Sequence, residues 1–109
     1  MDDSRFSLAA ENDGRTLRLK LAGDFDRAAT GQVDAAVDAA RGYALERLVL
    51  DLSALTFVDL AALRTLLRVH RRAQADAGAM TVIRPRGLAN RVFTLTRAGE
   101  TLPLVDAAD

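Results

Sequence analysis

The strongest constraint on the fold is a strand, a helix and a second strand that follow one another in the middle of the chain. Residues 46–52 (ERLVLDL) and 80–83 (MTVI) are short apolar runs with β-branched character. Between them, apolar side chains recur at helical spacing over residues 60–77, and Gly78 marks the end of that helix. A strand–helix–strand unit of this kind joins parallel strands, so we predict an α/β domain with a mostly parallel sheet.

The flanking segments extend this pattern. Residues 16–23 alternate between apolar and basic side chains, as expected of a half-buried strand, and we predict a hairpin with a short strand at 6–10. Further helices are predicted at 28–41, with Gly42 as the stop signal, and at 88–99.

Two remaining segments complete the expected architecture. Residues 53–59 (SALTFVD) are predicted as a loop, and residues 102–105 (LPLV) as a last strand or a docking tail. The apolar side chains of the loop are expected to turn back onto the core; they are Leu55, Phe57 and Val58. The expected order is β-β-α-β-α-β-α in a single domain, residues 1–109. Its mixed sheet has roughly four to five strands, the first of them antiparallel at an edge, packed with about three or four helices.

The composition excludes several kinds of chemistry. The chain has no cysteine and a single histidine, His70, so disulfides, thiolate metal sites and a Ser/His/Asp triad are not expected. Its 15 basic and 15 acidic residues balance, so we expect no attraction to nucleic acid. No stretch approaches the ~20 apolar residues of a membrane span, and the opening MDDSRFSLAA lacks the basic head of a secretion signal. We therefore expect a cytoplasmic protein without direct membrane insertion.

Four aspartates lie near strand ends, where α/β proteins gather functional groups; they are Asp24, Asp26, Asp51 and Asp59. A general acid/base pair or a Mg²⁺ site is one interpretation. The structural interpretation is favoured, in which Asp26 and Asp59 cap the helices that follow them and Asp51, inside a strand, holds the following loop by hydrogen bonds. No base or nucleophile accompanies them, the phosphate-binding glycine motifs are absent, and His70 falls on the apolar stripe of its helix. We predict no catalytic residue, no metal and no cofactor, and hence no enzyme.

Residues 48–78 (LVLDLSALTFVDLAALRTLLRVHRRAQADAG), preceded by LAGDFD, resemble the STAS domains, the family of anti-sigma-factor antagonists. Members typically have an apolar strand ending in Asp-Leu, a short loop, and then Asp-Ser-Ser-Gly opening a helix that ends near a glycine. The family's Gly-x-x-Asp turn is matched by residues 23–26, and the downstream helix around 92–96, followed by Gly99 and Leu-Pro-Leu, also fits. The resemblance covers nearly the whole chain.

The resemblance implies binding rather than chemistry. Such a domain docks onto an anti-sigma factor with a serine-kinase-like ATPase fold, and phosphorylation of the second serine of Asp-Ser-Ser-Gly ends the complex. A phosphate adds about −1.5 to −2 charges at the centre of the contact surface. In this chain Asp59 matches the aspartate, but Leu60, Ala61 and Ala62 stand where Ser, Ser and Gly are expected. The phosphoacceptor position is therefore Ala61, which has no oxygen to modify.

The leading hypothesis is an interaction module that binds an anti-sigma factor or a related ATPase-fold regulator without phosphorylation control at Ala61. The predicted partner-binding surface consists of Asp24, Phe25, Asp26, Asp59, Leu60, Ala61 and Arg64. Leu60 is either an exposed anchor, which contributes roughly 1.5–3 kcal/mol when a partner buries it, or packs beneath residues 53–58. Thr56 and Thr65 are candidate substitutes for the lost phosphoacceptor.

Two further hypotheses stay open. Some stand-alone STAS proteins are accessory subunits of lipid-transporting ABC complexes, where the domain stabilises the ABC transporter ATPase and needs no phosphoacceptor. A small enzyme or ligand-binding protein would instead use the cluster of Asp24, Asp26 and Asp59. One face of the predicted helix 60–77 carries arginines, which form either a solvated face or a surface for an acidic partner; they are Arg64, Arg68, Arg71 and Arg72.

Overall fold

The strands form one mixed sheet in which each strand lies beside its neighbours in the sequence. The computed structural model describes residues 5–40, 45–76 and 78–107. Within these residues the strands are β1 (Ser7–Asn12), β2 (Thr16–Phe25), β3 (Arg47–Val58), β4 (Ala79–Ile83) and β5 (Leu104–Val105). Their order is β1-β2-β3-β4-β5, with β1 antiparallel to β2 and the other pairs parallel. The predicted α/β fold with an antiparallel edge strand is confirmed.

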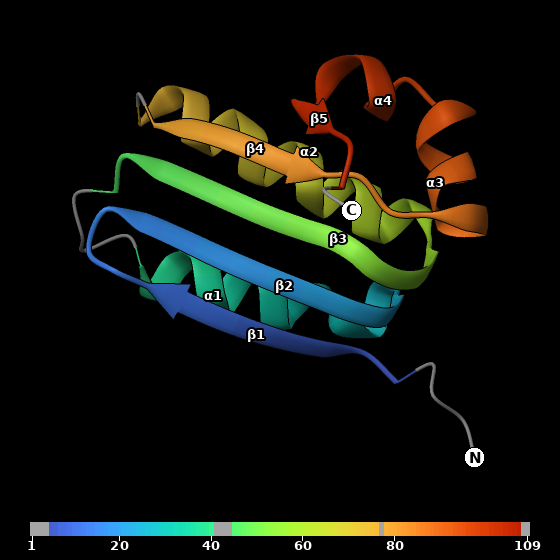
Figure 1. Cartoon of the computed structure of the whole chain (residues 1–109), viewed down its shortest axis with the longest axis horizontal. Helices are drawn as coiled ribbons and strands as arrows, with labels where there is room; N and C mark the ends of the chain where they lie inside the picture. Colours follow the sequence, from blue (N-terminus) through green and yellow to red (C-terminus); the bar gives the residue numbers. More distant parts are fainter. Residues whose placement is uncertain (1–4, 41–44, 77, 108–109) are drawn as a thin grey trace.

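The helices lie in the connections between parallel strands. They are the 3-10 helix η1 (Arg27–Ala29) and the α-helices α1 (Thr30–Ala39), α2 (Leu60–Ala75), α3 (Gly87–Thr94) and α4 (Ala98–Thr101). In Figure 1, α1 and α2 lie behind the sheet, and the face toward the viewer is open over β1, β2 and β3. The single helix predicted at 88–99 is divided into α3 and α4. The stop signal predicted at Gly42 lies outside the described residues.

The alternation in β2 decides which face of the sheet is buried. The three leucines of its TLRLKL segment are at most 3% exposed, whereas the arginine and lysine between them are exposed on the open face. Leu50 in β3 and Val82 in β4 continue the same apolar layer and are fully buried. Each such side chain stabilises the fold by roughly 1.5–3 kcal/mol relative to an exposed one, so the layer under the helices holds the sheet in place.

β3 is longer than predicted, because residues 53–58 continue the strand instead of forming a loop. The strand pairs with β2 to its last residue through two register shifts, each of which inserts one extra β3 residue. These bulges change the spacing of buried positions from two residues to three, so that Leu52, Leu55 and Val58 are all buried. The broken alternation explains why the segment does not look like a strand in the sequence. Phe57, expected in the core, is 49% exposed.

The buried face of α2 is rotated away from the predicted stripe. Leu63 and Leu66 are buried as expected, but Thr65 and Val69 are buried as well. The other members of the predicted stripe are only half-buried; they are Leu67, His70 and Ala73. The reason is α1, which packs along this flank of α2 and covers side chains that a helix lying on a sheet alone would leave exposed.

Two arginines of the predicted stripe on α2 pair with α1. The guanidinium of Arg68 lies 2.8 Å from the carboxylate of Asp34, and that of Arg72 lies 3.2 Å from Asp38. Partly exposed pairs of this kind contribute about 0–1 kcal/mol each, so they mainly fix how the two helices lie. Arg64 is exposed and forms no such pair with another residue that the structure describes.

Two helical glycines differ in the space around them. At Gly31 in α1, an added Cβ would meet no atom within 4 Å. At Gly99 in α4, it would lie 2.5 Å from the carbonyl oxygen of Phe93 in α3. The close approach of α4 to α3 therefore requires a residue without a side chain at position 99, and this approach divides the predicted single helix.

We expect Gly31→Ala to raise the free energy of unfolding by about 0.4–1 kcal/mol, because alanine restricts the unfolded chain more than glycine does. Gly99→Ala is expected to lower it by about 1–3 kcal/mol, because the methyl group overpacks the contact with α3. Urea denaturation followed by circular dichroism measures both variants. A Gly99→Ala protein as stable as the wild type would contradict the close packing of α4 on α3.

Candidate protein-binding surface

The carboxyl ends of β2 and β3 and the first turn of α2 lie together at one end of the sheet. Parallel strands bring their carboxyl ends to the same edge, and here the backbone N–H of Asp59 donates to the carbonyl of Phe25 at 3.3 Å. Six of the seven residues predicted as partner-binding are exposed or half-buried at this end. We call them the rim: Asp24, Asp26, Asp59, Leu60, Ala61 and Arg64.

The side chain of Asp59 accepts hydrogen bonds from two elements of the rim end of the sheet. Its Oδ1 accepts a hydrogen bond from the backbone N–H of Ala62 at 2.9 Å, which confirms the predicted cap of α2. Its Oδ2 accepts a second bond from the backbone N–H of Arg27 at 3.0 Å, in the turn that follows β2. The sequence does not predict the second bond, because Arg27 lies 32 residues away. One carboxylate thus fixes the start of α2 against the end of β2.

The first turn of α2 presents aliphatic groups. Leu60 is 61% exposed, so it does not pack beneath residues 53–58. Ala61 is half-buried and Arg64 is exposed. Leu60 and Arg64 are four residues apart and therefore share one side of the helix. This turn offers a leucine, a methyl group and a guanidinium, which can make contacts but cannot act as a nucleophile.

The other two carboxylates of the rim also accept hydrogen bonds from the chain. Asp26 accepts one from the backbone N–H of Ala28 at 3.0 Å and caps η1, as predicted. Asp24 accepts one from the hydroxyl of Thr56 at 2.9 Å. Both line a hollow of about 490 Å³ beside Arg5. The three rim carboxylates therefore act as caps and ties, which is the structural interpretation rather than the acid/base one.

Phe25 is the predicted surface residue that the structure places elsewhere. Its side chain is fully buried, and its ring centroid lies 5.4 Å from that of Phe6. The prediction is wrong because residues 23–25 belong to β2 rather than to a turn, and the alternation of the strand directs Phe25 toward the helices. Phe57 is the exposed aromatic residue at this end, paired in register with Asp24. Its position follows from the bulges in β3, which the sequence does not reveal.

The two candidate substitutes for the lost phosphoacceptor differ in accessibility. Thr65 is 2% exposed, and its hydroxyl donates to the carbonyl of Ala61 at 3.1 Å, so it is closed to modification in the folded protein. Thr56 is exposed and lies at the second bulge of β3, where its hydroxyl donates to Asp24. The accessible Thr56 therefore stays a candidate substitute, whereas the burial of the Thr65 hydroxyl does not fit that role.

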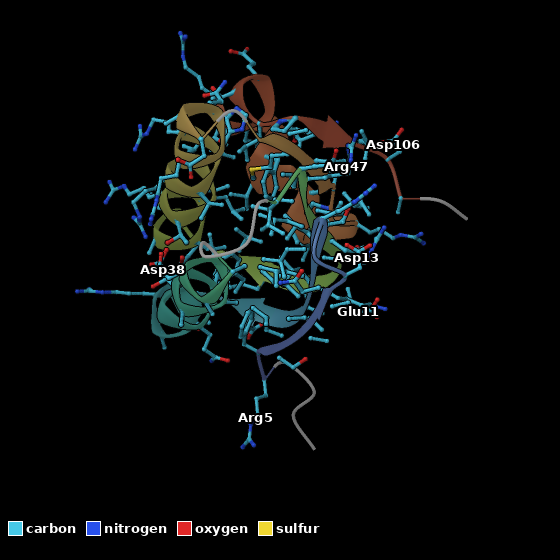
Figure 2. All side chains as sticks on the ribbon, turned by 90° about the vertical axis from the view of Figure 1, so that its left-hand side faces the viewer. Arg5, Glu11, Asp13, Asp38, Arg47 and Asp106 are labelled. Carbon is cyan, nitrogen blue, oxygen red and sulfur yellow. The ribbon has the colours of Figure 1, made fainter. Side chains whose placement is uncertain are left out.

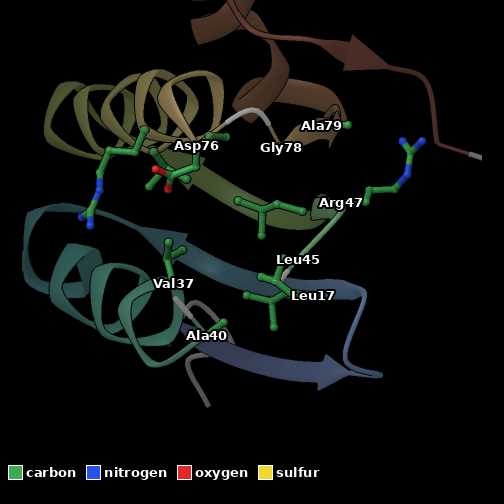
Figure 3. Close-up of a pocket in the computed structure, with 12 residues that line it drawn as sticks. Leu17, Val37, Ala40, Leu45, Arg47, Asp76, Gly78 and Ala79 are labelled. Carbon is green, nitrogen blue, oxygen red and sulfur yellow. The ribbon is translucent and has the colours of Figure 1, made fainter. Parts of the chain in front are cut away.

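A cavity of about 280 Å³ lies at the opposite end of the sheet, where the parallel strands begin. It opens between α1, α2 and the first residues of β2, β3 and β4, and aliphatic side chains such as Leu17, Val37 and Leu48 form much of its wall (Figure 3). Asp76 is the one carboxylate among its described lining residues, and the side chain of Arg47 points away from the aliphatic wall (Figure 3). The lining residues thus provide no pair of groups suited to acid–base catalysis.

Metal binding and membrane crossing find no support in the part of the chain that the structure describes. Across residues 5–40, 45–76 and 78–107, no group of three or more His, Cys, Asp or Glu side chains could hold a metal ion. Over the same ranges, no helix has both the length and the apolar character needed to cross a bilayer.

Asp51 lies in β3 on the open face of the sheet. Burial alone would raise the pKa of its carboxyl group. The hydroxyl and backbone N–H of Ser53, at 2.7 and 3.0 Å, together with Lys20 and Arg18, outweigh this effect and hold the pKa below its ordinary value of 3.8. The predicted hydrogen bonds from Asp51 to the residues that follow it are confirmed, but these residues continue β3 instead of forming the expected loop. Because the folded pKa is depressed, the carboxylate stabilises the fold above pH 3.8, and this contribution is lost as the pH falls through the folded pKa.

Comparison with models of protein families identifies the family of this chain. The family model described as "Mlab, STAS domain" matches residues 8–106. The chain belongs to the STAS family. STAS domains are generally binding modules without enzymatic activity, which agrees with a rim that lacks a reactive group. A comparison with curated proteins found no match.

Several solved structures share the fold of this chain. An anti-sigma factor antagonist from Mycobacterium paratuberculosis is 24% identical, with a TM-score of 0.81 over 98% of this chain and 91% of its own. The Bacillus cell fate determinant SpoIIAA in its phosphorylated form is 23% identical, with a TM-score of 0.70 over 96% and 93%. The murine anion transporter Slc26a9 matches 98% of this chain with 21% of its own, at 12% identity and a TM-score of 0.70. The STAS fold thus occurs both in small antagonists and within a transporter.

Replacing Asp59 is expected to destabilise the STAS domain more than replacing Asp26. Asp59→Ala removes the cap of α2 and the bond to Arg27, with an expected loss of about 2–3 kcal/mol, whereas Asp26→Ala removes one cap, with a loss of about 1 kcal/mol. Urea titration of both variants gives the comparison. Equal losses would show that the bond from Arg27 contributes nothing to stability.

Ser53→Ala is expected to raise the pKa of Asp51, because the variant loses a hydroxyl donor while burial still opposes the charged form. Carbon-detected NMR titration of the carboxyl groups measures the shift. Asp13 is the internal control, since backbone N–H groups of Thr16 and Arg15 lower its pKa in a distant turn. The destabilisation by Ser53→Ala should be larger at neutral pH than at a pH below the folded pKa of Asp51, where the carboxyl group is protonated in both proteins. An unchanged pKa of Asp51 would contradict the role of the hydroxyl.

Proposed function

We propose that this STAS domain is a protein-interaction module that binds an anti-sigma factor or a related ATPase-fold regulator through the rim. The exposure of Leu60 carries this proposal: it is 61% exposed at the first turn of a helix whose other leucines and valine are buried or half-buried. A partner that covers Leu60 gains roughly 1.5–3 kcal/mol from this one side chain. Phe57, 49% exposed at the same end, adds apolar surface to the contact.

The proposed complex is not controlled by phosphorylation at Ala61. This residue is the second of α2 and stands where the STAS resemblance implies the phosphoacceptor serine. Its methyl group offers no oxygen, so a kinase-fold partner has no group to modify at the centre of the contact. Binding is then governed by the amounts of the two proteins, or by a modification at another residue of the rim.

A second candidate is an accessory subunit of a lipid-transporting ABC complex, in which the domain stabilises the ABC transporter ATPase. The aliphatic first turn of α2 supports this candidate as well, because a permanent subunit needs contact area and no phosphoacceptor. The two candidates differ in where the partner is found. Recovery with a soluble sigma regulator favours the first, and recovery with a membrane complex favours the second.

Ala61→Asp is the variant that tests the proposed surface. It places a charge beside Leu60 and Asp59, so we expect the affinity for the partner to fall at least about ten-fold. The fold should be unaffected, because an acidic side chain in the first turn of a helix interacts favourably with the helix dipole. Ala35→Asp, on the exposed side of α1, adds the same charge away from the rim and is the matched control.

The measurement is an affinity purification from the native cell with wild-type, Ala61→Asp and Ala35→Asp baits, followed by calorimetry with the partner that is identified. Thermal unfolding of the three baits checks that each is folded. We expect the partner to be recovered with the wild type and with Ala35→Asp but not with Ala61→Asp. Equal recovery with all three baits would place the interface away from the rim.

A further inference from the structure

β1 is the exposed edge of the sheet. Among the described residues it pairs with β2 on one side only, five of its six residues are exposed, and its sequence SLAAEN contains neither proline nor lysine. Those two residues are common means of protecting an edge strand from pairing with another chain. At the other edge, β5 has only two residues and offers little backbone for pairing. β1 therefore presents a row of backbone donors and acceptors that is open to a further strand.

The side chains along β1 are compatible with a second copy of the same strand. Arg5 and Glu11 lie toward its two ends; both are exposed, and no ion pair joins either to another described residue. Figure 2 shows Arg5 directed away from the body of the protein at the free edge, with Glu11 farther along the strand. Between them, Ser7 and Ala9 are small, and Leu8 is half-buried on the helix side. Opposite charges at the two ends of a strand complement each other when two copies run antiparallel.

We propose that two copies of this chain pair through antiparallel β1 strands about a twofold axis at Leu8. This register sets Arg5 opposite Glu11 of the second copy, twice per dimer, and sets Ser7 opposite Ala9. On the helix side, Leu8 meets Leu8 of the second copy and Phe6 meets Ala10. The contact is self-complementary, as a twofold interface requires. The proposal goes beyond the proposed function, because it does not use the rim.

The alternating faces of the strand restrict the register. A shift by one residue would place the apolar side of one strand against the open side of the other, so only shifts by two residues are compatible with both sheets. A twofold axis at Ala9 would set Phe6 opposite Asn12 and Glu11 opposite Ser7. An axis at Ser7 would leave Glu11 without a described residue opposite. The axis at Leu8 pairs apolar with apolar and acidic with basic side chains.

The proposed dimer leaves the rim residues of α2 accessible to a partner. The rim residues of α2 follow β3, and β2 separates β3 from the edge at β1. The two sheets continue into one another, and the antiparallel arrangement places the two copies of α2 far apart. One dimer can thus hold two partners, which raises its avidity for an assembled or oligomeric target.

Charge exchange across the interface tests the register. Sedimentation velocity over a concentration series, up to about 1 mM, is expected to show a reversible monomer–dimer equilibrium for the wild type. Arg5→Glu and Glu11→Arg should each raise the dissociation constant about ten-fold or more, because each replaces two attractive cross-strand pairs by repulsive ones. The double variant Arg5→Glu/Glu11→Arg should restore dimerisation. Thermal unfolding of each variant shows whether it is folded.

Two results would overturn the proposal. One is a wild-type protein that stays monomeric over the whole series. The other is a dimer that responds equally to the single and double variants, since it would use another surface or another register. Amide exchange gives a second readout: β1 amides should become more protected as concentration rises in the wild type but not in the single variants. Failure of these tests leaves the rim proposal untouched, because the Ala61→Asp experiment uses a different surface.

Discussion

The two hydrogen bonds accepted by Asp59 are the interaction on which the candidate surface depends. One oxygen caps α2 and the other holds the turn after β2, so the carboxylate joins elements that are far apart in sequence. Because each of its two oxygens accepts a hydrogen bond from a backbone N–H group, the side chain has a structural role. The position of this carboxylate at the candidate surface is thus accounted for by its structural role. It keeps Leu60 and Ala61 in a fixed position relative to the acids of the turn.

The rim combines a rigid support with an inert surface. Phe25 fills the core directly beneath it, and Leu55 and Val58 extend the same layer to the end of β3. Above it lie the exposed Leu60 and Arg64 and half-buried carboxylates that already accept hydrogen bonds. The exposed ring of Phe57 lies at the same end of the sheet. Such a surface gains free energy by excluding water rather than by bond rearrangement. The absence of a hydroxyl at position 61 leaves the surface without the charge switch that the STAS resemblance implies.

Much of the fold could be predicted from the sequence, because periodicity and stop signals are local. The alternation in β2, the helical spacing in α2 and the cap at Asp59 all follow from neighbouring residues. The errors have long-range causes. Bulges that depend on pairing with β2 conceal the second half of β3, and α1 buries the flank of α2 that carries Val69. For the same reason the sequence does not reveal that Phe25 is buried and that Phe57 is the exposed aromatic residue at this end of the sheet.

The strand order has a consequence for how the chain acquires its structure during synthesis. Every strand pairs with the one that precedes it, so the sheet can grow in the order in which the ribosome releases the chain. The β1–β2 hairpin needs only local contacts, and each later βα unit finds its template already in place. No strand depends for its pairing on a segment that is translated much later. A topology of this kind limits the time in which a nascent chain can associate with the wrong neighbour.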